Sequence, residues 1–262
     1  KKTTIFMDNR ILLASKSPRR REILASLGVR FRVLTADTDE TCDEKDPASL
    51  VLLLSERKAV AAANAFVPKR EFDTAFRKFI MDTFPSRNEA SSDDPPIRVP
   101  YKPLAVGDAP QKERVIYPFE DPGEDYIVGC DTVVAVEGEI LGKPKDEEDA
   151  KRMLRLLSGR THSVFSGLHV IRFSDRKSAG AVRQTHVTFA PLSEEEIAFY
   201  IRHGSVYDKA GAYAVQGLAS AFIKEIEGDY FNVVGFPVQT FFSLMEKDFG
   251  LAPTELLAKM PL

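Results

Sequence analysis

Cysteine is scarce in this chain, with Cys42 and Cys130 the two examples among 262 residues. Neither belongs to a CxxC pair or stands next to a histidine cluster, so the sequence predicts neither a disulfide framework nor a structural zinc site. We expect both side chains to be reduced thiols. Cys130 ends an apolar run that begins at Tyr126, which favours a place in the core of a strand over a role as a nucleophile.

Long hydrophobic runs and a strong excess of one charge are also missing. The longest apolar runs, such as residues 50–54, are too short to cross a bilayer, and the first residues show no signal-peptide core. Lysine plus arginine is 36 and aspartate plus glutamate is 39, a net charge of −3, which argues against coating nucleic acid through bulk positive charge. We expect a cytoplasmic protein without nucleic-acid or membrane partners.

Two familiar signatures of phosphate and metal binding are absent. The sequence has no Walker-type glycine loop, which excludes a P-loop enzyme. Its four histidines show no metal-ligand spacing, and His162, His169 and His186 fit exposed strand positions. Any phosphate or metal site must therefore come from other side chains.

The pattern of apolar and polar residues predicts alternating strands and helices. Hydrophobic residues make up 44 % and charged residues 29 % of the chain, as in ordinary folded proteins. Expected strands cover residues 11–14, 31–34, 127–136, 163–173, 182–189, 213–215 and 222–226, and expected helices cover residues 18–27, 47–64, 146–157, 193–202 and 237–247. Such a mixture implies an α/β sheet with helices on its faces.

The segment at residues 66–124 differs in character from the rest. Prolines and charges crowd it, and helical spacing is visible over residues 71–84. We interpret it as an insertion or mobile loop that interrupts a single domain spanning residues 10–250.

A candidate anion site lies where the first expected strand runs into a helix. Hydroxyls at Ser15 and Ser17 and guanidinium groups at Arg19 and Arg20 gather around that helix start, where we expect Ser17 to cap the helix. The partial positive charge of a helix N-terminus and the forked guanidinium both suit phosphate oxygens. A capped surface helix with solvated arginines is the alternative.

Carboxylates and lysines elsewhere could complete such a site. Asp131 closes an apolar run at a strand end, where the sites of open α/β sheets lie, and Asp37, Asp39 and Glu40 follow the second expected strand in an acidic run. Together they could bind Mg²⁺, which prefers carboxylate oxygens plus substrate phosphates. Lys58 in the long helix and Lys143 in a turn could cover phosphate charge. Taken singly, an acidic loop or a lysine is more often simply solvated.

Short motifs follow one another in a specific order. They read ASKSPRR at residues 14–20, GCDT at 129–132, LGKP at 141–144, LLSGRTH at 156–162, DKAGAYAVQG at 208–217 and VVGFP at 233–237. Together they resemble the signature segments of the Maf family of nucleotide pyrophosphatases. The resemblance covers residues 10–66 and 124–249. Cys130 and Phe236 stand where the family commonly has alanine and leucine, both apolar exchanges.

The resemblance implies a fold and a reaction. The fold is the Maf/Ham1 (ITPase-like) α/β fold, an elongated, twisted mixed sheet flanked by helices, with a deep cleft between two lobes, in a homodimer. The reaction is hydrolysis of a nucleoside triphosphate between its α and β phosphates, with Mg²⁺ as cofactor, for which Mn²⁺ or Co²⁺ can substitute. Nucleoside monophosphate and pyrophosphate are the products.

The resemblance also implies roles for particular residues. Asp131, Lys58 and Lys143 are the expected catalytic residues, and Asp131 matches the family's proposed base for activating water. Glu40 and Asp131 are the expected metal ligands, and the sequence does not separate the acid that binds metal from the one that takes the proton. Expected substrate contacts are Ser15, Ser17, Arg19, Arg20, Thr132 and Gln216.

The resemblance also implies a preference for particular nucleotide bases. The segment AGAY followed by Gln216 resembles the branch that prefers dTTP and UTP over 7-methyl-GTP, which makes Gln216 and Thr132 candidates for reading the base. Two alternatives stay open: a purine pyrophosphatase for inosine or xanthosine triphosphates, and a nucleotide-binding regulator of cell division or septum formation. The complete set of basic and acidic site residues favours an enzyme over a regulator.

Overall fold

A computed structural model describes residues 11–66 and 126–257 of the chain. The proline-rich segment, with its helical spacing at residues 71–84, lies outside the described residues. Its interpretation as an insertion within one domain at residues 10–250 therefore stays a prediction. None of the described helices is long and apolar enough to cross a membrane.

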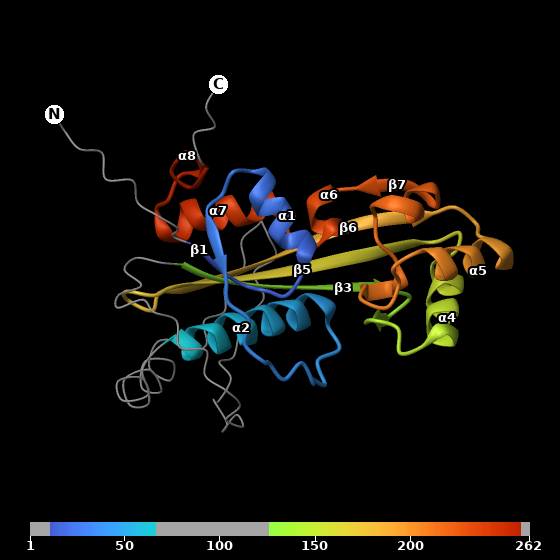
Figure 1. Cartoon of the computed structure of the whole chain (residues 1–262), viewed down its shortest axis with the longest axis horizontal. Helices are drawn as coiled ribbons and strands as arrows, with labels where there is room; N and C mark the ends of the chain where they lie inside the picture. The colour runs from blue at the N-terminus through green and yellow to red at the C-terminus, as the bar shows by residue number, and fades with distance from the viewer. Residues whose placement is uncertain (1–10, 67–125, 258–262) are drawn as a thin grey trace.

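A seven-stranded mixed sheet runs through the molecule (Figure 1). Its strands are β1 (Ile11–Ala14), β2 (Phe31–Val33), β3 (Tyr126–Val136), β4 (Glu139–Leu141), β5 (Thr161–Arg172), β6 (Ser178–Phe189) and β7 (Ile223–Glu227). The order is β2-β1-β3-β5-β6-β7, and β4 pairs with β3. β1 is parallel to β2 and β3, whereas the remaining pairs are antiparallel. The long antiparallel strands β3, β5 and β6 give the molecule its elongated shape.

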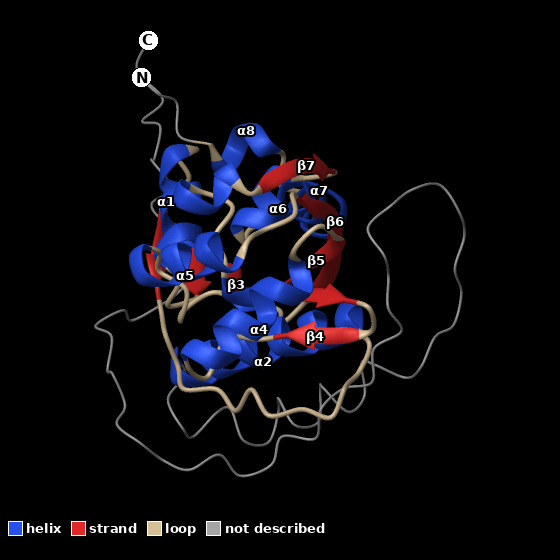
Figure 2. Cartoon of the chain, turned by 90° about the vertical axis from the view of Figure 1, so that its right-hand side faces the viewer, coloured by secondary structure: helices blue, strands red, loops and turns tan. Residues whose placement is uncertain are grey.

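Helices cover both faces of this sheet (Figures 1 and 2). They are α1 (Pro18–Ser26), α2 (Pro47–Phe66), α4 (Glu147–Leu157), α5 (Glu194–His203), α6 (Tyr230–Val234), α7 (Val238–Phe249) and α8 (Pro253–Leu256), with 3-10 turns η1 (Ala210–Ala212) and η2 (Gly217–Ala221). α2 lies on one face, α1, α6 and α7 lie on the other, and α4 and α5 sit towards one end. The expected mixed sheet flanked by helices is confirmed.

Two glycines allow α2 to lie directly against the sheet. A Cβ atom at Gly129 in β3 would collide with the carbonyl oxygen of Ser55, and one at Gly167 in β5 would collide with the carbonyl oxygen of Val51. Glycine leaves that space to the helix backbone. The side chains of α2 therefore lie next to the part of β3 around Cys130.

Several local predictions hold because their causes are local. The spacing of Ser193 and Glu196 in the sequence predicts a capping box, and the two residues form it at the start of α5. Cys130 is a free thiol, fully buried in β3, and burial raises the pKa of that thiol, which fits strand core. The expected strand at residues 213–215 is wrong, because this segment bonds to side chains: Tyr200 Oη accepts a hydrogen bond from the Ala214 nitrogen at 3.2 Å.

The expectation of exposed histidines is wrong for two of them. His162 is 2 % and His169 is 6 % exposed, because helices and turns cover both faces of β5. His162 Nε2 lies 2.7 Å from the Tyr213 hydroxyl. His186 is half-buried, with Nδ1 3.1 Å from Ser163 Oγ. Burial lowers the pKa of His162 and of His169 to about 4.

These two histidines should make the protein less stable in mild acid. The unfolded chain takes up their protons near the ordinary histidine pKa of 6.5, whereas the folded protein resists protonation until about pH 4. The free energy of unfolding should therefore fall as pH drops from 6.5 towards 4, by on the order of 1 kcal/mol per histidine. Urea unfolding midpoints at pH 7.5 and pH 5 measure the change.

Single substitutions separate this effect from that of other titrating groups. His169→Gln should reduce the loss of stability between the two pH values, and His203→Gln, at an exposed position on α5, should leave it unchanged. The same loss in the His169→Gln protein as in the parent would contradict the assignment.

Candidate active site

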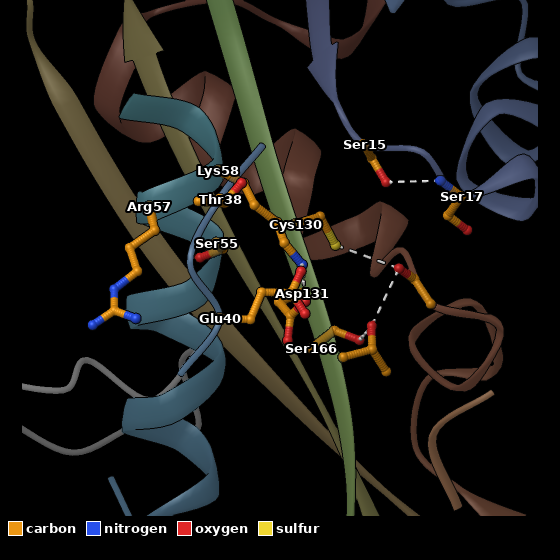
Figure 3. Close-up of polar contacts among 12 residues, drawn as sticks. Ser15, Ser17, Thr38, Glu40, Ser55, Arg57, Lys58, Cys130, Asp131 and Ser166 are labelled. Carbon is orange, nitrogen blue, oxygen red and sulfur yellow. Dashed lines mark hydrogen bonds and ion pairs between the residues drawn. The ribbon is translucent and has the colours of Figure 1, made fainter. Parts of the chain in front are cut away.

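Lys58 of α2 lies at the centre of a small charged cluster. Its Nζ atom is 2.9 Å from Oε1 of Glu40, and it also pairs with Oδ1 of Asp131. Asp131 comes from β3 and Glu40 from the loop that joins β2 to α2, and Figure 3 shows the three side chains converging. The side chains of Lys58 and Asp131 are 16 % and 12 % exposed. The structure thus brings together three residues that the sequence predicted as one site.

Glu40 is the more exposed acid of the cluster. Burial opposes its ionisation, but the hydrogen bond and charge of Lys58, together with the charges of Lys143 and Arg20, outweigh burial and hold the pKa of Glu40 below its usual value. Glu40 is therefore a carboxylate at neutral pH. The influence of Lys143 on this pKa also shows that its exposed ammonium group lies within electrostatic reach of the cluster.

Arg57 fixes the loop that carries Glu40. Its Nη1 atom donates to the carbonyl oxygens of Asp39, at 3.0 Å, and Thr41, at 2.8 Å, which flank Glu40 on either side. The side chain points away from the Lys58 cluster (Figure 3). Sequence reasoning missed Arg57, because its position next to Lys58 carries no signal that both side chains reach the same loop.

Arg20 ties the turn after β1 to two distant segments. It is 9 % exposed, and its Nε donates to the Gly235 carbonyl oxygen at 2.8 Å. Nη1 donates to Ser15 Oγ at 3.0 Å and Nη2 to Thr132 Oγ1 at 3.1 Å. All three guanidinium nitrogens of Arg20 thus donate hydrogen bonds within the protein. The contact of Arg20 with substrate stays a prediction.

The start of α1 is arranged differently from the expected cap. Ser17 occupies the cap position but makes no side-chain capping bond, so the capping prediction is wrong. Ser15 Oγ instead accepts from the Ser17 backbone nitrogen at 3.2 Å. The same Ser15 oxygen also accepts from Nη1 of Arg20.

Arg19 is a second arginine at this turn, and one of its hydrogen-bond donors is unused among the described residues. It is half-buried, and burial lowers its pKa, although the charge of Asp208 opposes that shift. Its buried Nε finds no hydrogen-bond partner among the described residues. A buried donor of this kind is suited to an anionic ligand.

Two motif turns meet beside the cluster. The Gly211 nitrogen of η1 donates to the Gly142 carbonyl oxygen at 3.0 Å, which docks the turn that carries Lys143. The neighbouring Lys209 is 9 % exposed and pairs with Asp208. Sequence reasoning used this motif only for the resemblance and did not single out Lys209, which is buried although it is basic.

Gln216 occupies a different place from Thr132. Gln216 is exposed just before η2 and lines a cavity of about 410 Å³. The other residues that line this cavity are Val215, Gly217, Ser220, Ile223, Ile226 and Tyr230. Thr132 lies in the hydrogen-bonded network of Arg20. The structure therefore places Thr132 beside Arg20, and the base-reading roles of Thr132 and Gln216 stay predictions.

The carboxylates of Glu40 and Asp131 lie together at Lys58, and their role as metal ligands stays a prediction. Across residues 11–66 and 126–257, no three histidine, cysteine or acidic side chains cluster in a way that could hold a metal ion. Mg²⁺ is commonly bound through one or two carboxylates plus substrate phosphates. Two carboxylates that already share one cation, the ammonium of Lys58, fit that chemistry.

Known proteins resemble this chain over most of its length. The family model described as Maf-like protein matches residues 10–248. A dTTP/UTP pyrophosphatase of Caldanaerobacter subterraneus is 36 % identical over 242 residues, which cover 92 % of this chain and 90 % of the relative. The enzyme of the same name from Thermoanaerobacter sp. (strain X514) is 35 % identical, covering 92 % and 98 %. That from Clostridium acetobutylicum is 37 % identical, covering 90 % and 96 %.

Replacing Arg20 by lysine should destabilise the protein. One ammonium cannot reach Ser15, Thr132 and Gly235 together, so buried acceptors would lose their donors, at a cost of about 2 kcal/mol or more. Urea unfolding at pH 7.5 measures the free energy. Arg21→Lys, one position further along α1 and exposed, is the matched control, and we expect a change below about 0.5 kcal/mol. Equal effects of the two substitutions would rule out the structural role of Arg20.

Proposed function

The chain belongs to the Maf family, and we propose that it is a nucleoside triphosphate pyrophosphatase that converts dTTP and UTP to the monophosphate and pyrophosphate. The names of its relatives support this reaction and this base preference. The observation that carries the proposal is the pairing of Lys58 with both Glu40 and Asp131. That cluster lies close enough to the basic turn after β1 for Arg20 to affect the ionisation of Glu40.

In the proposed reaction, basic groups hold the triphosphate. Arg19 has a buried donor available, and the hydroxyls of Ser15 and Ser17 lie in the same turn. Lys143, whose charge acts on Glu40, would add a further positive charge from the turn after β4. Their positive charge offsets the charge of the phosphates and the negative charge that develops on the departing pyrophosphate.

Water is the nucleophile in this proposal. Its oxygen attacks the α phosphorus, the bond from the α phosphorus to the bridging oxygen breaks, and pyrophosphate leaves. Asp131 takes the proton from the water, and Lys58 orients that carboxylate by pairing with it.

We also propose Mg²⁺ as cofactor, with Mn²⁺ or Co²⁺ as substitutes. Glu40 and Asp131 would hold the ion. When bound, it would neutralise phosphate charge and align the triphosphate. A cytoplasmic homodimer that clears unwanted nucleotides from the pool completes the proposal, and its support is the family resemblance.

Asp131→Asn should lower kcat for dTTP and UTP by roughly 10² to 10⁴-fold, the range for loss of a general base. Pyrophosphate release with Mg²⁺ measures the rate for dTTP, UTP, CTP, ITP and XTP. Asp37→Asn, at an exposed acid paired with Lys16, should stay within about twofold of the parent.

Each other outcome of this assay contradicts part of the proposal. Preference for ITP or XTP would favour the purine alternative. Nucleotide binding without turnover would favour a regulator. Full turnover by the Asp131→Asn protein would overturn the proposed mechanism.

Arg57→Ala should weaken the contribution of Glu40 without removing it. The loop would lose the two hydrogen bonds that flank Glu40, so we expect the Mg²⁺ concentration for half-maximal activity to rise by about three- to tenfold. Mg²⁺ titrations of pyrophosphate release measure it, with Arg202→Ala at an exposed position of α5 as control. An unchanged Mg²⁺ requirement in Arg57→Ala would show that the loop needs no such anchor.

A further inference from the structure

A chain of hydrogen bonds leads from the site into the core. Thr132 of β3 and Ser166 of β5 stand directly opposite each other in the sheet, with their Oγ1 and Oγ atoms 2.8 Å apart. Ser166 Oγ donates to the carbonyl oxygen of Asn232 in α6 at 3.2 Å. At the other end, Thr132 Oγ1 accepts from Nη2 of Arg20 at 3.1 Å. Figure 3 labels Ser166 on β5, the strand that pairs with β3.

The two ends of this chain set its direction. A carbonyl oxygen can only accept and a guanidinium can only donate, whereas each hydroxyl has one proton to give. When Ser166 gives its proton to Asn232, its oxygen is left to accept from Thr132. The other acceptor near Thr132, the carbonyl oxygen of Gly235, is 3.5 Å away, at the limit of hydrogen-bond distance and a much weaker partner than Ser166 Oγ at 2.8 Å. Ser166 is therefore the partner that takes the proton of Thr132.

The inner end of the chain is held firmly. Asn232 is fully buried, and its Nδ2 donates to the Val164 carbonyl oxygen and to Thr185 Oγ1, both at 3.0 Å. Ser166 is also fully buried, whereas Thr132 is only half-buried. Thr132 thus carries the hydroxyl that can contact a ligand. Ser166 determines whether that hydroxyl donates or accepts towards the ligand.

We propose that Ser166 is a positioning residue that makes Thr132 a hydrogen-bond acceptor towards the substrate's base, and so selects uracil and thymine over cytosine. The inference rests on the proposed function, in which Thr132 contacts substrate. Uracil and thymine share an N3–H donor, whereas cytosine presents a bare N3 lone pair at the same place. An acceptor at Thr132 can accept a hydrogen bond from the N3–H of uracil or thymine. With cytosine, the lone pair of Thr132 would face the lone pair of N3, and no hydrogen bond would form. A site built around one hydrogen bond rejects ligands that cannot make it.

The test is the ratio of kcat/KM for UTP to that for CTP. We expect the parent to favour UTP by at least about tenfold, the worth of one hydrogen bond. Ser166→Ala frees the Thr132 proton for donation, so the ratio should fall by about tenfold. Partial unfolding cannot mimic this result, because the active fraction of enzyme cancels in the ratio. Ser163→Ala removes another hydroxyl of β5, which bonds to Gln184 and His186, and should leave the ratio unchanged.

A third substrate locates the group that is read. The analogue 4-thio-UTP keeps N3–H and changes the atom at C4, so the parent should cleave it within about threefold of UTP. Discrimination against 4-thio-UTP as strong as that against CTP would place recognition at C4 and overturn the proposal.

A double-mutant cycle tests whether Ser166 acts through Thr132. Thr132→Val removes the hydroxyl at nearly constant volume and should lower the ratio by itself. Adding Ser166→Ala to Thr132→Val should then change nothing further, because the group it orients is gone. If Ser166→Ala destabilises the chain too far, Ser166→Cys, a weak donor of similar size, should give an intermediate ratio.

The failures are distinguishable. If the parent cleaves UTP but the ratio is the same in Ser166→Ala, or falls equally with and without Thr132, only this inference is overturned. If the parent releases pyrophosphate from no triphosphate, the proposed function is overturned and this inference with it.

Discussion

The close contact between α2 and the sheet is the constraint on which the site depends. Gly129 and Gly167 leave no side chain between the strands and the helix backbone at Ser55 and Val51. At that separation Lys58 reaches Asp131 directly. A side chain at either glycine would push the helix outward, and the pairing that defines the charged cluster would lengthen with it.

From that contact, α2 organises the loop before it. Arg57 and Lys58 are adjacent, yet one binds the loop backbone on both sides of Glu40 and the other binds its carboxylate. The acid is therefore placed by a regular helix even though it belongs to an irregular segment. Preorganisation of this kind matters for a charged site, because ordering a mobile carboxylate on ligand binding costs free energy and weakens the binding.

The opposite side of the site is joined by hydrogen bonds. Arg20 links Ser15, Thr132 and the end of α6, and Ser166 continues that link from Thr132 into the core. A guanidinium at one end and a carbonyl at the other give the hydroxyls between them a single sense of donation. One buried network thus holds the turn after β1 and determines the direction of donation at Thr132, a candidate base-reading residue.

The sequence by itself determined the strand and helix at residues 11–26, the capping box of Ser193 and Glu196, and the burial of Cys130. It also supplied the candidate residues Glu40, Lys58 and Asp131. Periodicity, capping and motifs are local patterns, so they can be recognised without the fold. Only the tertiary structure decided that His162 and His169 are buried and that residues 213–215 form no strand. It also decided that Arg57 binds the loop of Glu40 and that Ser166 meets the hydroxyl of Thr132. These outcomes depend on which faces are covered and which segments meet. Contacts between residues far apart in the chain decide both, and no local pattern records them.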